Sequence, residues 1–267
     1  MKKKSFLAFI PGNLNYFSYK NLLGLKKNIN SELNFFLFPW EDTKQTKINH
    51  IKKIYKPIFL KKIYKPNYKN IVKKIKYPDY AGNSIGTLYM WESIRQSFLQ
   101  INNFYKDKKK PDYVIRYRYD ILSKYNFKLI KENLKKNEII VPDRYHWNGL
   151  NDQIFITRFS DIVLFFDIDK FIKKFIKDDR FFCSEFLFQQ FLKYKKIKVK
   201  YSNFDYSLMR PKGFNKINNN VKSEMKFFDK LNCKFNKLNY RLRNFNNHYI
   251  KKKYTNKNQE KIVKLNF

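Results

Sequence analysis

The chain has 267 residues, 43% of them hydrophobic and 19% aromatic, which excludes a disordered chain and allows one large domain with a real core. Its formal net charge is +36, from 58 Lys and Arg against 22 Asp and Glu. Because the basic residues are mostly Lys and are spread along the chain, solvated lysine faces explain the charge better than a nucleic-acid site, where arginines gather on one strip.

Strand and helix patterns alternate through the first hundred residues. The predicted elements are strands over Ser5–Ile10 and Leu33–Phe38 and helices over Tyr16–Lys27 and Ser84–Ile101. A strand, a helix and a strand in this order predict a βαβ unit with a parallel sheet. The Lys- and Tyr-rich residues 43–79 are interpreted as an insertion that leaves the core.

The alternation continues through the second half. The predicted elements there are strands over Asp112–Ser123, Glu138–Pro142, Gln153–Thr157, Ile197–Tyr201 and Tyr206–Arg210, and helices over Asp161–Ile176 and Ser184–Tyr194. The sequence therefore predicts an α/β fold with a mostly parallel central sheet flanked by helices. Residues 1–210 form the predicted catalytic domain, and residues 211–267 a basic C-terminal extension that is helical or partly flexible.

The most informative segment is Asp112–Asp120. Alternate side chains of a strand share a face, so Arg116, Arg118 and Asp120 point one way. Charged groups on a buried strand are costly unless they are paired or serve a site, and the carboxyl end of a strand is where open α/β sheets bind ligands. Two guanidinium groups would hold a diphosphate and the carboxylate a metal or sugar hydroxyls. The alternative is an internal Arg–Asp salt bridge.

Three weaker signals lie nearby in the predicted fold. Asn151, Asp152 and Gln153 precede an apolar strand, where an ordinary turn is the competing interpretation. Glu185 stands near the positive end of a helix that Ser184 would cap, and capping alone accounts for both. The acidic pair after Trp40 is interpreted as a turn at the same sheet edge.

In this order the motifs resemble GT-A-like glycosyltransferases of surface-polysaccharide and lipopolysaccharide synthesis, including the WavE-type proteins. The resemblance spans about residues 5–210 and rests on the Arg-x-Arg-x-Asp and Asn-Asp-Gln elements. It implies a GT-A-like fold and the transfer of a hexosyl or related sugar from a nucleotide-sugar donor to a surface glycan or a lipid-linked acceptor. The donor-binding residues it implies are Pro11, Gly12, Asn13, Trp40, Arg116, Arg118, Asp120, Asn151 and Gln153.

The resemblance also implies catalytic roles. Asp152 is the first candidate for the base that takes the acceptor's proton in an inverting reaction, and Glu185 is the second. A retaining reaction would not use a base in this way, and both outcomes stay open. The family often employs a divalent cation, Mg²⁺ or Mn²⁺, and Asp120 is the candidate ligand. Because Arg118 stands where relatives carry a second acid, one carboxylate alone is a poor metal site.

Two other classes of function compete with the enzyme. One is a basic nucleic-acid-binding protein without enzymatic activity, and the other is a nonenzymatic scaffold for polysaccharide assembly at a membrane. The two cysteines and three histidines show no disulfide framework and no zinc spacing, which favours a cytoplasmic protein. So basic a surface predicts peripheral contact with anionic lipid at the inner face of the membrane.

Overall fold

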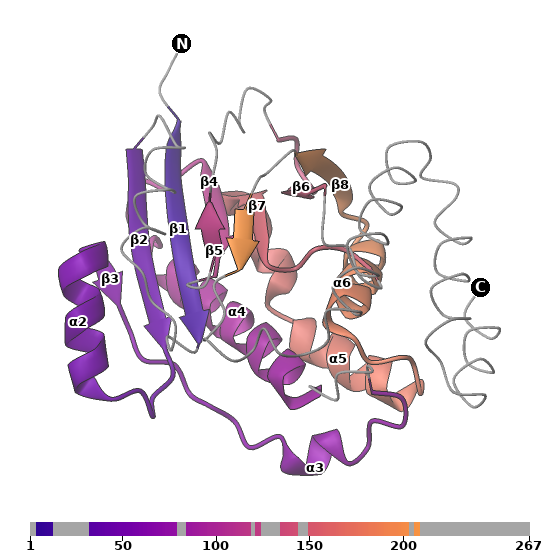
Figure 1. Ribbon diagram of the computed structural model, residues 1–267. Helices are drawn as coiled ribbons and strands as arrows, with labels where there is room; N and C mark the ends of the chain where they lie inside the picture. Colours follow the sequence, from indigo (N-terminus) through magenta and orange to yellow (C-terminus); the bar gives the residue numbers. More distant parts are fainter. Residues whose placement is uncertain are drawn as a thin grey trace.

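The computed structural model describes residues 4–12, 32–78, 84–118, 121–123, 134–143, 149–202 and 206–208 (Figure 1). Several sequence predictions lie outside these residues: the helix over Tyr16–Lys27, the donor-binding residues Asn13 and Asp120, and the extension 211–267.

The centre of the molecule is a seven-stranded sheet in the order β3-β2-β1-β4-β7-β6-β8. Its strands are β1 (Ser5–Gly12), β2 (Glu32–Pro39), β3 (Phe59–Leu60), β4 (Tyr113–Tyr117), β6 (Glu138–Pro142), β7 (Ile154–Arg158) and β8 (Lys198–Ser202). All neighbours are parallel except β7, which is antiparallel to both β4 and β6. The predicted α/β class with a mostly parallel central sheet is therefore confirmed.

Helices and a small second sheet cover the two faces. The helices are α2 (Gln45–Tyr55), α3 (Lys69–Val72), α4 (Ser84–Phe104), the 3-10 helix η1 (Phe159–Phe165), α5 (Ile168–Lys177) and α6 (Ser184–Tyr194). The second sheet pairs β5 (Ile121–Ser123) with β9 (Tyr206–Leu208). In β1 the alternation divides the core: Leu7 and Phe9 pack with α4, η1, α5 and α6, whereas Phe6, Ala8 and Ile10 pack with α2 and the β5–β9 pair.

Two predicted elements are divided in the structure. The single strand expected over Asp112–Ser123 stops at Tyr117, and its last three residues form β5, which leaves the central sheet to pair with β9. The helix expected over Asp161–Ile176 is a 3-10 turn followed by α5. Apolar residues keep the strand period through Ile121 in the first segment and the helical period through Ile176 in the second, so neither pattern predicts the interruption.

Parts of the segment 43–79 pack on the core, and the interpretation of this segment as an insertion stays a prediction. Ile51 and Tyr55 of α2 pack beneath the sheet, where the rings of Tyr55 and Phe35 lie 5.5 Å apart. β3 pairs in parallel with β2 and becomes the edge strand of the central sheet.

The strand order creates a switch point at β1. The chain passes from β1 to β2 on one side and later enters β4 on the other, and all three strands are parallel. In open α/β sheets ligands bind outside the carboxyl ends of the strands at such a point. Because β7 runs antiparallel, with Ile154 opposite Tyr117, the residues just before β7 reach this same edge.

Candidate functional site

The carboxyl ends of β1 and β2 meet α4 closely. Gly12 has φ of 81°, in the left-handed region that favours glycine. A Cβ placed there would lie 3.3 Å from both Ser93 Oγ and Trp40 Nε1. The predicted donor-binding residues Pro11, Gly12 and Trp40 are thus neighbours at the switch-point edge, and all three are buried. Their contact with a donor stays a prediction.

Arg116 lies on the face of β4 that the alternation predicts, since Ile115 and Tyr117 belong to the core of the opposite face. Its side chain is only 2% exposed, and its Nη1 donates a hydrogen bond to the backbone oxygen of Asp152. This geometry gives Arg116 a positioning role in fixing the residues before β7. Arg118 follows β4 at the same edge of the sheet and is partly exposed.

Asp152 is a buried carboxylate, 3% exposed, that accepts a hydrogen bond from the hydroxyl of Ser184. No basic side chain in the part of the chain that the structure describes forms an ion pair with it. The expected capping by Ser184 is wrong: Cys183 occupies the N-cap position of α6 without a side-chain cap bond, and Ser184 turns toward Asp152 instead.

The two amides beside Asp152 share one phenol. Asn151 Nδ2 donates to Tyr206 Oη at 2.6 Å, and that hydroxyl donates to Gln153 Oε1 at 3.0 Å. Asn151 Oδ1 also accepts the backbone N–H of Gln153 at 2.9 Å. All three side chains are buried, so these bonds fix the loop that carries Asp152. Tyr206 was predicted only as a strand residue, because the pairing of β5 with β9 has no local signal.

The start of α6 supports the loop from the other side. The backbone N–H of Leu150 donates to the backbone oxygen of Glu185 at 3.0 Å. A Cβ on Gly149 would fall well under 3.0 Å from the backbone of Glu185 and Phe186, so only glycine fits there. Glu185 stands in the first turn of α6, partly exposed, and its Oε2 accepts the Cys183 thiol at 3.0 Å. Both predicted catalytic carboxylates therefore belong to one packed unit.

Contacts along α4 join this unit to the end of β1. Ser184 Oγ lies 3.9 Å from Met90 Sδ, and the Met90 carbonyl accepts the hydroxyl of Ser93 at 2.7 Å. Ser93 is the side chain beside Gly12. The predicted site residues from β1, β2, β4 and the loop before β7 thus lie around one edge of the sheet.

The described residues contain no group of three or more His, Cys, Asp or Glu side chains that could hold a divalent cation. Asp152 supplies one carboxylate, which already accepts the Ser184 hydroxyl. Asp120 lies outside the described residues, so metal binding there stays a prediction.

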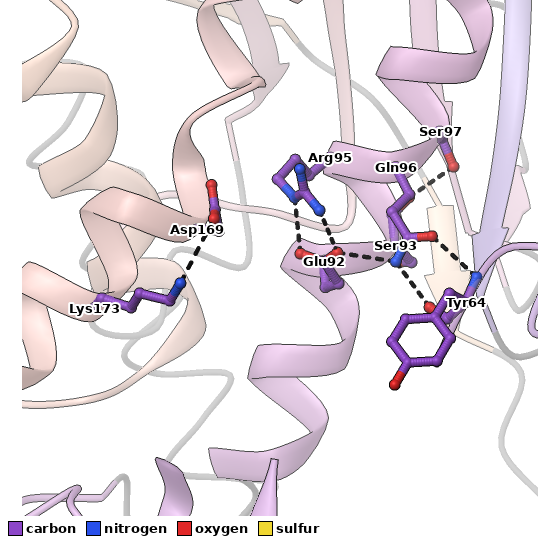
Figure 2. A network of polar contacts seen from close by, with 8 residues as sticks. All are labelled: Tyr64, Glu92, Ser93, Arg95, Gln96, Ser97, Asp169 and Lys173. Atoms are coloured by element: carbon purple, nitrogen blue, oxygen red, sulfur yellow. Dashed lines mark hydrogen bonds and ion pairs between the residues drawn. The ribbon is translucent and has the colours of Figure 1, made fainter. Parts of the chain in front are cut away.

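A second polar network on α4 fixes the chain after β3, as Figure 2 shows. Glu92 accepts bonds from Arg95 Nε at 2.9 Å and Nη2 at 2.6 Å, and from Gln96 Nε2 at 2.9 Å. The hydrogen bond to Glu92 raises the pKa of Arg95 above its ordinary value. Gln96 also accepts the backbone N–H of Tyr64 at 3.0 Å and donates to its carbonyl at 2.7 Å, as a neighbouring strand would.

The structure of this chain is similar to solved structures of glycosyltransferases. No family model matches the chain, and no curated protein matches it in sequence. The galactosyltransferase LgtC, solved with donor and acceptor sugar analogues, shares 12% identity at a TM-score of 0.44, covering 74% of this chain and 73% of LgtC. The glycosyltransferase GlyE of Streptococcus pneumoniae shares 13% identity at 0.42, covering 75% of this chain and 45% of GlyE. Mouse xyloside xylosyltransferase 1 shares 12% identity at a TM-score of 0.42, and the match covers 74% of this chain and 85% of that enzyme.

Among the described residues no helix combines the length and the apolar character that crossing a bilayer requires.

Proposed function

We propose that this chain is a nucleotide-sugar-dependent glycosyltransferase that moves a sugar to a surface glycan or lipid-linked acceptor in the cytoplasm. The observation that carries the proposal is the state of Asp152. It is a buried carboxylate at a switch-point edge, held by Ser184, yet it has no ion-pair partner in the described chain. Burying an unpaired carboxylate destabilises a protein by several kcal/mol, and proteins retain such groups chiefly where the group has a function.

Transfer from a nucleotide sugar needs positive groups for the departing diphosphate and, in an inverting reaction, a carboxylate for the acceptor's proton. The edge offers both kinds of group. We assign the diphosphate to Arg118, which is partly exposed at this edge, and the proton to Asp152 or, second, to Glu185. Arg116 serves the reaction by holding the Asp152 backbone. The Arg-x-Arg-x-Asp and Asn-Asp-Gln resemblance supports sugar transfer as the reaction class.

A nucleic-acid-binding protein without chemistry leaves this arrangement unexplained. Phosphate backbones are bound by exposed cations and amides, and a buried carboxylate repels them. The hydrogen bonds of Asn151, Asp152 and Gln153 position a buried carboxylate, which phosphate binding does not require.

The test is a turnover screen with UDP-, GDP- and CMP-sugars, with and without Mn²⁺, that measures released nucleotide. Asp152→Asn should lower kcat/KM by about 100-fold or more, because a positioned base contributes that much. Arg118→Ala should weaken nucleotide binding in a thermal-shift titration. The loss of kcat/KM in Glu185→Gln, compared with the loss in Asp152→Asn, shows which of the two carboxylates acts as the base.

A matched control is Asp161→Asn. Asp161 is equally buried, but its Oδ2 accepts the N–H of Asn137 and it follows the far end of β7, at the opposite edge of the sheet. This variant should lose stability and keep turnover per folded molecule. A folded Asp152→Asn protein with unchanged turnover would refute the proposed function.

A further inference from the structure

One continuous surface segment, residues 44–76, carries twelve lysines and no Asp or Glu. We call it the basic margin; it comprises α2, β3, α3 and their connections. Ten of the twelve lysines are exposed. Two of them pair with carboxylates beyond the margin, Lys65 with Asp42 and Lys76 with Asp179, each at 2.5 Å. The margin therefore presents a concentrated positive surface.

Its neighbours on the molecule differ in this respect. The helix α5 holds four lysines, and four acids lie in it or within two residues of its ends: Asp167, Asp169, Asp178 and Asp179; Lys173 lies 3.9 Å from Asp169. The charge of α5 is thus locally balanced, whereas that of the margin is not.

Two large apolar side chains stand among the margin's lysines. Ile58, directly before β3, is 51% exposed, and Tyr64, four residues after β3, is 62% exposed. Lys56, Lys61 and Lys62 flank them in sequence and are exposed. Lysines around exposed Ile and Tyr side chains suit the boundary of a bilayer, where cations meet lipid headgroups and apolar groups enter the acyl region.

The margin fits nucleic acid less well. It contains no arginine, the side chain that forms bidentate contacts with phosphate. Bases stack on aromatic rings, and of the two exposed apolar side chains only Tyr64 offers a ring, whereas Ile58 does not. We propose that the basic margin is a docking surface for the headgroups of an anionic lipid bilayer.

The margin's position would orient the molecule on that bilayer. Figure 1 shows the chain from β3 to α3 passing below the carboxyl ends of β1 and β2. Ile63 forms a parallel bridge with Trp40 there, and the backbone N–H of Glu41 donates to the Ile63 oxygen at 2.9 Å. Gln96 fixes the Tyr64 backbone to α4. Docking would therefore bring the switch-point edge toward the membrane surface; the benefit for a lipid-linked acceptor rests on the proposed function.

The experiment is co-flotation of the full chain with vesicles of phosphatidylcholine containing roughly one third phosphatidylglycerol, against pure phosphatidylcholine. Lys52, Lys53, Lys56 and Lys61 are exchanged together for Gln; none of them forms an ion pair within the described structure. The matched control exchanges Lys170, Lys173, Lys174 and Lys177 on α5, which removes the same charge and also two cations from a last helical turn.

The margin variant should weaken the vesicle partition coefficient at least about ten-fold, and the α5 variant less than about three-fold. Salt should abolish binding of both. A third variant, Ile58→Ser with Tyr64→Ser, leaves the charge unchanged and should still weaken binding several-fold, because it removes the inserted groups.

Equal losses in the two lysine variants would show attraction to net charge anywhere and would overturn the proposal. So would unchanged binding of the Ser variant combined with tighter, margin-dependent binding to random single-stranded RNA. Because flotation needs no donor and turnover can be read with a soluble acceptor, failure of docking and failure of the proposed function are separate results.

Discussion

Replacing Gly149 by alanine tests whether the loop before β7 is held as tightly as the structure shows. The added Cβ would fall under 3.0 Å from the backbone of Glu185, where ordinary contact needs about 3.5 Å or more, so the loop or α6 must move by about 1 Å. Overpacking of this kind costs about 1–3 kcal/mol. Losing the Leu150 N–H to Glu185 bond costs about 1 kcal/mol more.

Alanine also restricts the unfolded chain, which offsets roughly 0.4–1 kcal/mol and leaves a net loss of about 1–3.6 kcal/mol. For a chain of this size the melting temperature should fall by roughly 2–14 °C. Differential scanning calorimetry measures it. Gly86→Ala, in the first turn of α4, is the matched control and should be neutral or stabilising, because alanine suits a helix better than glycine. A Gly149→Ala protein that melts within about 2 °C of wild type would refute the close approach.

Three further changes follow from the described contacts. Tyr206→Phe removes the hydroxyl that two buried amides share and should lower the unfolding free energy by about 1–3 kcal/mol in urea melts, with a larger loss in kcat than in KM. Gln96→Leu leaves the Tyr64 backbone without its partner and should expose the chain after β3 to limited proteolysis, whereas wild type resists. The Lys135 backbone N–H lowers the pKa of Glu138, so its contribution is present above about pH 4.3 and fades as pH falls through the folded pKa; the stability difference between wild type and Glu138→Gln should shrink between pH 6 and pH 3.

The predictable part of the fold lies where local pattern and burial agree. Continuous apolar runs identified β1 and β2, and the helical spacing of Leu88, Trp91 and Phe98 identified the buried face of α4. The alternation in β4 placed Arg116 on its observed face. Its buried bond to the Asp152 backbone was not predictable, because it depends on a strand that arrives antiparallel much later in the chain.

The missed residues of the candidate site share a cause. Tyr206 acts through a pairing of distant strands, and Ser184 turns from its helix toward a loop, so tertiary contact overrode local preference in both. Gly149 could have been found. The chain has only six glycines, and one that stands two residues before a candidate Asn-Asp-Gln element suggests a backbone approach that no side chain would permit.

The loop that carries Asp152 is held by residues that lie far apart in the sequence and are therefore synthesised at different times. Its partners lie 36 residues earlier in β4, 32 residues later in α6 and 55 residues later, from Asn151, in β9. A nascent chain that ends at β8 contains every strand of the central sheet. It does not yet contain Tyr206, whose hydroxyl forms hydrogen bonds with Asn151 and Gln153. The loop that carries Asp152 therefore reaches its complete set of hydrogen bonds only when Tyr206 has been added, after every strand of the central sheet.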